Sequence, residues 1–159
     1  DIEFSNLKNY GPEKVGDILV KSSKLKGIEI PNKYIASAID EFPILFIAAA
    51  CASGKTILKN AEELKYKESD RLSVMSKGLL ECNIDSFLFD DGIEINGGKI
   101  SGGTIDSYGD HRIAMSFAIA GLISKDPITI LNTENVSTSF PEFFNLIKEM
   151  GLKIKREKI

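Results

Sequence analysis

The sequence predicts an α/β (α+β) protein in which one unit of helices and short strands occurs twice. Each copy opens with acidic residues before an apolar helix, at Asp40 and again at Asp110, and continues with a short buried strand and a second helix. The offset between the copies is 110 − 40 = 70 residues. We expect a single domain over residues 1–159, with pseudosymmetric internal repeats at about 40–108 and 110–159.

The first 35 residues are predicted to form strands and turns. Apolar residues up to Leu7 lead into a turn at residues 9–12. Alternating apolar residues then favour a strand at 17–22, and a shorter strand pattern follows at 27–31.

The first copy begins with a helix from Pro43 to about residue 52 that is apolar on nearly all sides. Such a helix is expected to be buried between layers. A buried strand follows at 56–58, and a second helix runs from a cap at Ser69 or Asp70 to about residue 82. The remaining elements are expected as a hairpin of 86–89 with 93–95, a Gly-rich strand within 99–108, an apolar helix at 113–123, a strand at 128–131, an amphipathic helix from Ser139 with Met150 inward, and a final strand at 152–155.

Composition places the chain among ordinary globular proteins, with 43% hydrophobic and 27% charged residues. A formal net charge of −3 argues against a general nucleic-acid or membrane surface, and we expect a cytoplasmic protein with neither partner. Because the chain opens with Asp1 in strand-like sequence, we expect it to be part of a longer protein. Cys51 and Cys82 are predicted to be buried thiols, and a single histidine argues against a zinc site.

A run of charged and hydroxyl side chains precedes the second helix of the first copy. If that helix begins at Ser69 or Asp70, Lys67 and Arg71 lie beside unpaired N–H groups and the positive end of the helix dipole. Such a helix start can bind an anion, and Glu68 between the two cations is favoured in its ionised form. A solvated helix start is the ordinary alternative, and the pattern alone leaves both interpretations open.

Three other helix starts also carry polar residues, at about 40–43, 110–112 and 137–141. In a pseudosymmetric domain equivalent helix ends can point the same way, so Arg112 would join the cations above around a polyanionic small molecule. Structural alternatives exist, because Asp40 can simply cap its helix and Arg112 can form a surface ion pair with Asp110. His111 can be a packed or capping residue rather than a catalyst.

Four sequence blocks resemble the 5-enolpyruvylshikimate-3-phosphate synthase family. They are, in the order of that family, Ile39-Asp40-Glu41-Phe42-Pro43, Glu63-Leu64-Lys65-Tyr66-Lys67-Glu68-Ser69-Asp70-Arg71-Leu72, Asp110-His111-Arg112-Ile113-Ala114-Met115 and Val136-Ser137-Thr138-Ser139-Phe140-Pro141-Glu142-Phe143-Phe144. The resemblance implies two lobes, each an inside-out barrel of three βαβαββ units, with the active site between them. This chain would then be most of the C-terminal lobe, and its partner would be the N-terminal lobe of the same enzyme.

The resemblance also implies an activity, the transfer of the enolpyruvyl group of phosphoenolpyruvate to the 5-hydroxyl of shikimate 3-phosphate, without a metal or cofactor. By motif, Asp40 would accept the hydroxyl proton and Glu68, assisted by Lys67, would handle the protons of the methylene carbon. Asp40 and Lys67 would also contact substrate. The remaining residues implied are Arg71 and Arg112, which would hold phosphoenolpyruvate with His111 close by, and the supporting carboxylates Glu41 and Asp110.

The chain departs from the common family pattern at Glu63, Lys65, Tyr66 and Thr138. Two other functions remain open at this point. One is a sister enzyme that transfers enolpyruvate to a UDP-sugar, although that enzyme is not expected to carry these motifs. The other is an isolated or degenerate lobe that binds anions without catalysis, which also describes what the chain is expected to do alone.

Overall fold

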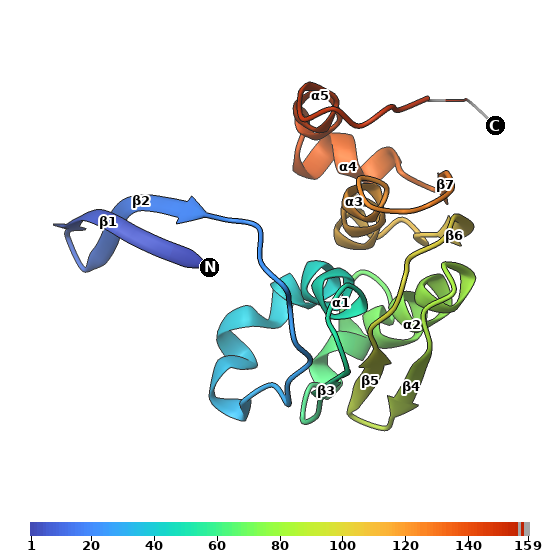
Figure 1. Cartoon of the computed structure of the whole chain (residues 1–159), viewed down its shortest axis with the longest axis horizontal. Helices are drawn as coiled ribbons and strands as arrows, with labels where there is room; N and C mark the ends of the chain where they lie inside the picture. The colour runs from blue at the N-terminus through green and yellow to red at the C-terminus, as the bar shows by residue number, and fades with distance from the viewer. Residues whose placement is uncertain (156, 158–159) are drawn as a thin grey trace.

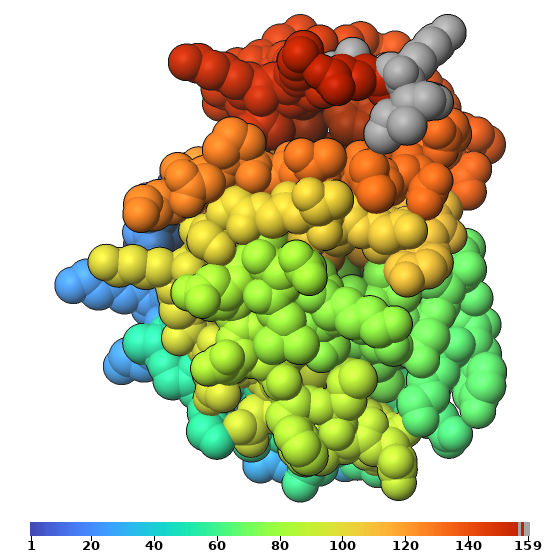
Figure 2. All heavy atoms as spheres, turned by 90° about the vertical axis from the view of Figure 1, so that its right-hand side faces the viewer, coloured from blue at the N-terminus to red at the C-terminus, as the bar shows by residue number. Residues whose placement is uncertain are grey.

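The structure, a computed structural model, describes residues 1–155 and Glu157 (Figure 1). Figure 2 shows the residues after about 125 stacked above a larger body that contains the green segments around residues 70–90. Within the described part of the chain, no helix combines the length and the apolar character that crossing a membrane requires.

Two parallel crossovers through a helix set the framework of the site. In the first, α1 (Phe42–Ala50) connects residues 26–30 to β3 (Lys55–Leu58), and isolated parallel bridges join these two segments. In the second, α3 (His111–Ala120) connects β6 (Gly103–Asp106) to β7 (Ile128–Leu131), which pair in parallel over four residues each. Parallel neighbours require such a crossover, and a helix usually supplies it. The pattern predicted as a strand at 27–31 forms no strand and contains one bridge residue, Glu29.

The segment between β3 and β6 corresponds to the rest of the first repeat expected from the sequence. It contains a 3-10 turn, η3 (Glu62–Tyr66), then α2 (Arg71–Glu81), β4 (Ser86–Phe89) and β5 (Gly92–Asn96). The predicted hairpin is confirmed, and β5 lies between β3 and β4 with both pairings antiparallel. Helix α2 turns an apolar stripe inward and begins at the predicted cap, because the Asp70 carboxylate accepts the Ser73 N–H at 3.0 Å.

The approach to α1 is made of two 3-10 segments, η1 (Asn32–Tyr34) and η2 (Ala36–Glu41). Helix α1 is less completely covered than its composition predicts, because Ile44 and Leu45 remain more than a third exposed. Cys82 is buried as predicted, whereas Cys51, just after the helix, is exposed. The apolar residues around Cys51 predicted that its thiol is buried, but α1 ends at Ala50 and Cys51 lies exposed just after it.

The end of the second copy differs from the prediction. A helix starting at Ser139 was expected, but the structure has α4 (Glu134–Ser139), an extended residue at Phe140 and then α5 (Phe143–Glu149). Pro141 explains the break, since proline lacks an N–H and disfavours helical geometry in the residue before it. Met150, predicted to face inward, is 67% exposed.

The final predicted strand is also absent, because residues 152–155 form no strand in the described chain. Their alternation has a different origin: Leu152 and Ile154 pack against a small hydrophobic cluster between α3 and α5. That cluster includes buried Val136 and Phe143, while a larger cluster fills the space among α1, α2 and the three-stranded sheet. Ile130 of β7 packs against both clusters, so the two parts share a boundary.

The first two strands form a ribbon that projects from the body (Figure 1). Strand β1 (Ile2–Tyr10) pairs antiparallel with β2 (Glu13–Val20), and every residue of both strands is exposed. The predicted turn is confirmed, with Gly11 at a φ of 62°. Strand β2 begins four residues before the strand predicted at 17–22, because pairing with β1 continues up to the turn.

Candidate active site

The guanidinium of Arg71 is the centre of a charged network. Its side chain is only 1% exposed and donates from three nitrogens to three carboxylates. Nε contacts Asp110 Oδ2 at 2.9 Å, Nη1 contacts Asp40 Oδ1 at 2.9 Å and Nη2 contacts Glu68 Oε2 at 2.6 Å. Burial alone would lower the pKa of Arg71, but these carboxylates raise it above its ordinary value. The buried cation is thus paired with three carboxylates, which offsets the cost of its desolvation.

Asp110 attaches this centre to the start of α3. Its carboxylate is 0% exposed and caps the helix by accepting the N–H groups of Arg112 at 3.0 Å and Ile113 at 3.4 Å. The other oxygen accepts the Ser69 hydroxyl at 3.1 Å in addition to Arg71 Nε. One side chain therefore joins the first turns of α2 and α3.

Asp40, at the end of η2, is the exposed side of the network. Besides Arg71, its carboxylate lies 3.7 Å from Lys67 Nζ and 4.0 Å from Arg112 Nη2. The hydrogen bond from Arg71 holds the pKa of Asp40 below its usual value, with further lowering by the charges of Lys67 and Arg112. Asp40 is therefore an ionised, partly exposed hydrogen-bond acceptor at neutral pH.

Lys67 and Arg112 flank Asp40 and each has a second carboxylate partner. Lys67 Nζ donates to Glu63 Oε1 at 2.7 Å, and this hydrogen bond raises the pKa of Lys67. Arg112 Nη1 donates to the Asp40 carbonyl at 2.8 Å and to Glu41 Oε1 at 3.1 Å. Both cations are thus held beside Asp40, on the exposed side of the network.

The structure brings together three of the four helix starts singled out in the sequence. The segments before α1, α2 and α3 meet through Arg71 and Arg112, with partners 31, 39 and 72 residues apart in the chain. His111 is half-buried as the first residue of α3, and its ring makes no hydrogen bond among the described residues. The fourth start does not take part, because Thr138 lies exposed on α4 without a hydrogen bond to the network in the described chain.

Two members of the network were not predicted as site residues. Ser69 was considered only as a helix cap, and Glu63 only as a departure from the family pattern. The i, i+4 spacing of Glu63 and Lys67 on one turn is a signal that could have indicated their ion pair. No sequence signal connects Ser69 to Asp110, which lies 41 residues further on.

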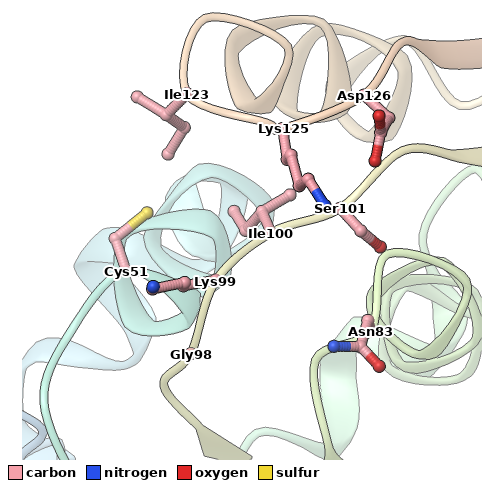
Figure 3. A pocket seen from close by; sticks show the side chains of 9 residues that line it. All are labelled: Cys51, Asn83, Gly98, Lys99, Ile100, Ser101, Ile123, Lys125 and Asp126. Carbon is pink, nitrogen blue, oxygen red and sulfur yellow. The ribbon is translucent and has the colours of Figure 1, made fainter.

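A separate hollow, drawn in Figure 3, shares no lining residue with this network. It has a volume of about 710 Å³ and is lined by Cys51, Asn83, Gly98, Lys99, Ile100, Ser101, Ile123, Lys125 and Asp126. Helices α1 and α3 approach it with their C-terminal ends, whose dipole is negative and does not favour an anion. Across residues 1–155 and Glu157, no group of three His, Cys, Asp or Glu side chains is arranged to hold a metal ion.

Comparisons with known proteins agree with the motifs. The model of the EPSP synthase (3-phosphoshikimate 1-carboxyvinyltransferase) family matches residues 9–147. A 3-phosphoshikimate 1-carboxyvinyltransferase from Legionella pneumophila strain Lens is 52% identical over 155 residues, or 98% of this chain and 36% of that protein. The protein of the same name from Coxiella burnetii strain RSA 331 is 47% identical over 155 residues, which are 98% of this chain and 35% of that protein.

Solved structures give the same result. An EPSP synthase from Acinetobacter baumannii matches with a TM-score of 0.94 and 49% identity, over 99% of this chain and 38% of that one. This likeness confirms the predicted fold class, part of a lobe of an enolpyruvyl transferase. The chain spans little more than a third of the length of these relatives. With a family model that matches most of its length and relatives about half identical to it, the chain belongs to the EPSP synthase (3-phosphoshikimate 1-carboxyvinyltransferase) family.

Proposed function

We propose that the chain is the part of a cytoplasmic 3-phosphoshikimate 1-carboxyvinyltransferase that supplies its acid–base groups and several of its anion-binding cations. The reaction transfers the enolpyruvyl group of phosphoenolpyruvate to the 5-hydroxyl of shikimate 3-phosphate and releases phosphate. One observation carries the proposal: the buried Arg71 guanidinium joins Asp40, Glu68 and Asp110, which come from three separate sequence motifs.

Asp40 and Glu68 are proposed to move the protons. In the addition step the 5-oxygen bonds to C2 of phosphoenolpyruvate, Asp40 takes the hydroxyl proton, and Glu68, in its protonated form, delivers a proton to the methylene carbon. In the elimination step the bond from C2 to the phosphate oxygen breaks, Glu68 takes a proton back from the methyl group to restore the double bond, and the proton held by Asp40 leaves with the phosphate. The geometry supports this role, because the Asp40 side chain is 46% exposed and its carboxylate oxygens can accept a further hydrogen bond from the substrate hydroxyl.

Lys67, Arg71 and Arg112 are proposed to hold the substrate anions, with His111 beside them. Three of the five N–H groups of Arg71 are used by carboxylates, so one on each Nη remains for a ligand. Glu41 and Asp110 support this arrangement by holding Arg112 and Arg71. Fixed cations of this kind stabilise negative charge that develops during the reaction.

The rest of the enzyme is proposed to come from the N-terminal lobe and the remaining part of this lobe, since the chain covers 36% to 38% of its relatives. We also propose that residues 1–159 form a single domain. In the charged network the side chains of Asp40 and Glu68 are about half exposed to water. Positioning of two substrates in a closed cleft is worth about 7–11 kcal/mol in such reactions. The chain alone is therefore proposed to be catalytically inactive.

The test is phosphate release from phosphoenolpyruvate and shikimate 3-phosphate by the full-length protein. Asp40→Asn and Glu68→Gln should each lower kcat about 10²–10⁴-fold, the range for losing an acid–base group. Glu62→Gln is the matched control, because Glu62 contacts only the Tyr66 hydroxyl and should leave kcat unchanged. Near-normal turnover by Glu68→Gln, or full turnover by the 159 residues alone, would contradict the proposal.

A further inference from the structure

The side chains of the charged network include more anions than cations. Its three cations are Lys67, Arg71 and Arg112, whereas its five carboxylates are Asp40, Glu41, Glu63, Glu68 and Asp110. A group of side chains with a surplus of two negative charges repels an arriving anion. An anionic substrate that binds Lys67 or Arg112 therefore competes with the carboxylates that already pair with these cations.

The five carboxylates differ in how easily they can give up their cations. Asp110 is completely buried, and Asp40 and Glu68 both pair with the buried Arg71. Removing any of these would leave a desolvated cation short of a partner, which is costly. Glu63 and Glu41 are 62% and 59% exposed, so their carboxylates can return to water at little cost.

We propose that Glu63 and Glu41 are exchangeable counter-ions, which hold Lys67 and Arg112 before substrate binds and are displaced by the carboxylate or phosphate groups of the substrate. This inference rests on the proposed function of the site. Each glutamate takes one cation: Glu63 contacts Lys67 at 2.7 Å and Glu41 contacts Arg112 at 3.1 Å.

The geometry explains why a counter-ion is useful before substrate arrives. Lys67 Nζ lies between Glu63 and Asp40, and Arg112 lies between Glu41 and Asp40. Glu63 therefore holds the long, flexible side chain of Lys67 next to Asp40, and Glu41 does the same for Arg112. The substrate hydroxyl and anions are proposed to bind at this place. Preorganised cations lose less side-chain entropy when the ligand binds. The disadvantage is that the glutamates and the substrate anions compete for the same N–H donors of Lys67 and Arg112.

The proposal predicts that removing the glutamate charge strengthens anion binding. Glu63→Gln and Glu41→Gln should each raise the affinity for inorganic phosphate about two- to five-fold, the effect of one exposed ion pair. The double variant should combine both effects, because the glutamates hold different cations. Glu63→Asp keeps the charge and should bind phosphate within about two-fold of the unmodified chain.

The experiment is a phosphate titration of the 159-residue chain and its variants, followed by amide chemical shifts of residues around Arg71 and Arg112 at constant ionic strength. Glu62→Gln is the control, since it removes the same charge one residue away without touching a cation. Tighter binding by both glutamine variants but not by the control supports the proposal. Unchanged or weaker binding, an equal gain in the control, or no binding in any variant overturns it.

This measurement is independent of turnover. A full-length protein that fails to transfer enolpyruvate would refute the proposed function, while the phosphate titration would still decide whether the glutamates compete with an anion. A second readout, the pKa of the Lys67 ammonium by NMR, should fall in Glu63→Gln because its strongest hydrogen-bond acceptor is gone. A pKa that stays the same would show that Glu63 does not hold Lys67.

Discussion

Replacing Asp110 by alanine should destabilise the chain far more than the loss of an ordinary helix cap. Asp110 does two things at once: it caps α3 through the N–H groups of Arg112 and Ile113, and it pairs with the buried Arg71. Alanine removes both functions and leaves Arg71 with two carboxylates instead of three.

The magnitude follows from these two contributions. Loss of an aspartate cap costs about 1 kcal/mol. Removing one partner of a buried ion pair costs about 3–5 kcal/mol, and the lower end applies because Asp40 and Glu68 remain on Arg71. We therefore expect the free energy of unfolding to fall by about 4 kcal/mol, which corresponds to a decrease in Tm of roughly 8–16 °C for a domain of this size.

The assay is urea denaturation of the chain, followed by circular dichroism, with Asp70→Ala as the matched control. Asp70 is also an N-terminal cap, of α2, but it is exposed, and among the described residues its carboxylate forms no ion pair with the Arg71 guanidinium. Asp70→Ala should cost only about 1 kcal/mol. The difference of about 3 kcal/mol between the two variants isolates the contact with the buried guanidinium. Equal losses in the two variants would refute this reasoning.

Two further predictions concern pH and packing. Because the pKa of Asp40 is lowered in the folded chain, its ionised form contributes stability that is present above the unfolded pKa of about 3.9 and lost as pH falls through the folded value. The urea midpoint should thus decrease more between pH 5 and pH 3 in the unmodified chain than in Asp40→Asn. An equal decrease in the two proteins would contradict this. Gly78→Ala should lower Tm although alanine favours helices by about 1 kcal/mol, because its Cβ would lie 2.4 Å from Phe117 Cζ and overpacking costs about 1–3 kcal/mol. Thermal unfolding decides, and a higher Tm would show that Phe117 can move aside.

The local elements of the fold could be predicted because their signals are local. The cap at Asp70, the hairpin of β4 and β5 and the strand β7 each depend on residues within one turn or one strand. The same holds for the turn at Gly11. Predictions failed where the decisive contact was distant or absent, as at residues 152–155, whose alternation has no partner strand in the described chain.

The candidate site was predictable as a group of residues but not as a set of contacts. Sequence motifs indicated that Asp40, Lys67, Glu68, Arg71 and Arg112 act together, and the positive ends of their helices indicated an anion. Only the tertiary structure decided that Arg71 is buried among three carboxylates and that Glu41 and Glu63 hold the outer cations. The reason is physical: the contacts around Arg71 and Arg112 join segments up to 72 residues apart, and which charges pair depends on how three helix starts pack against one another.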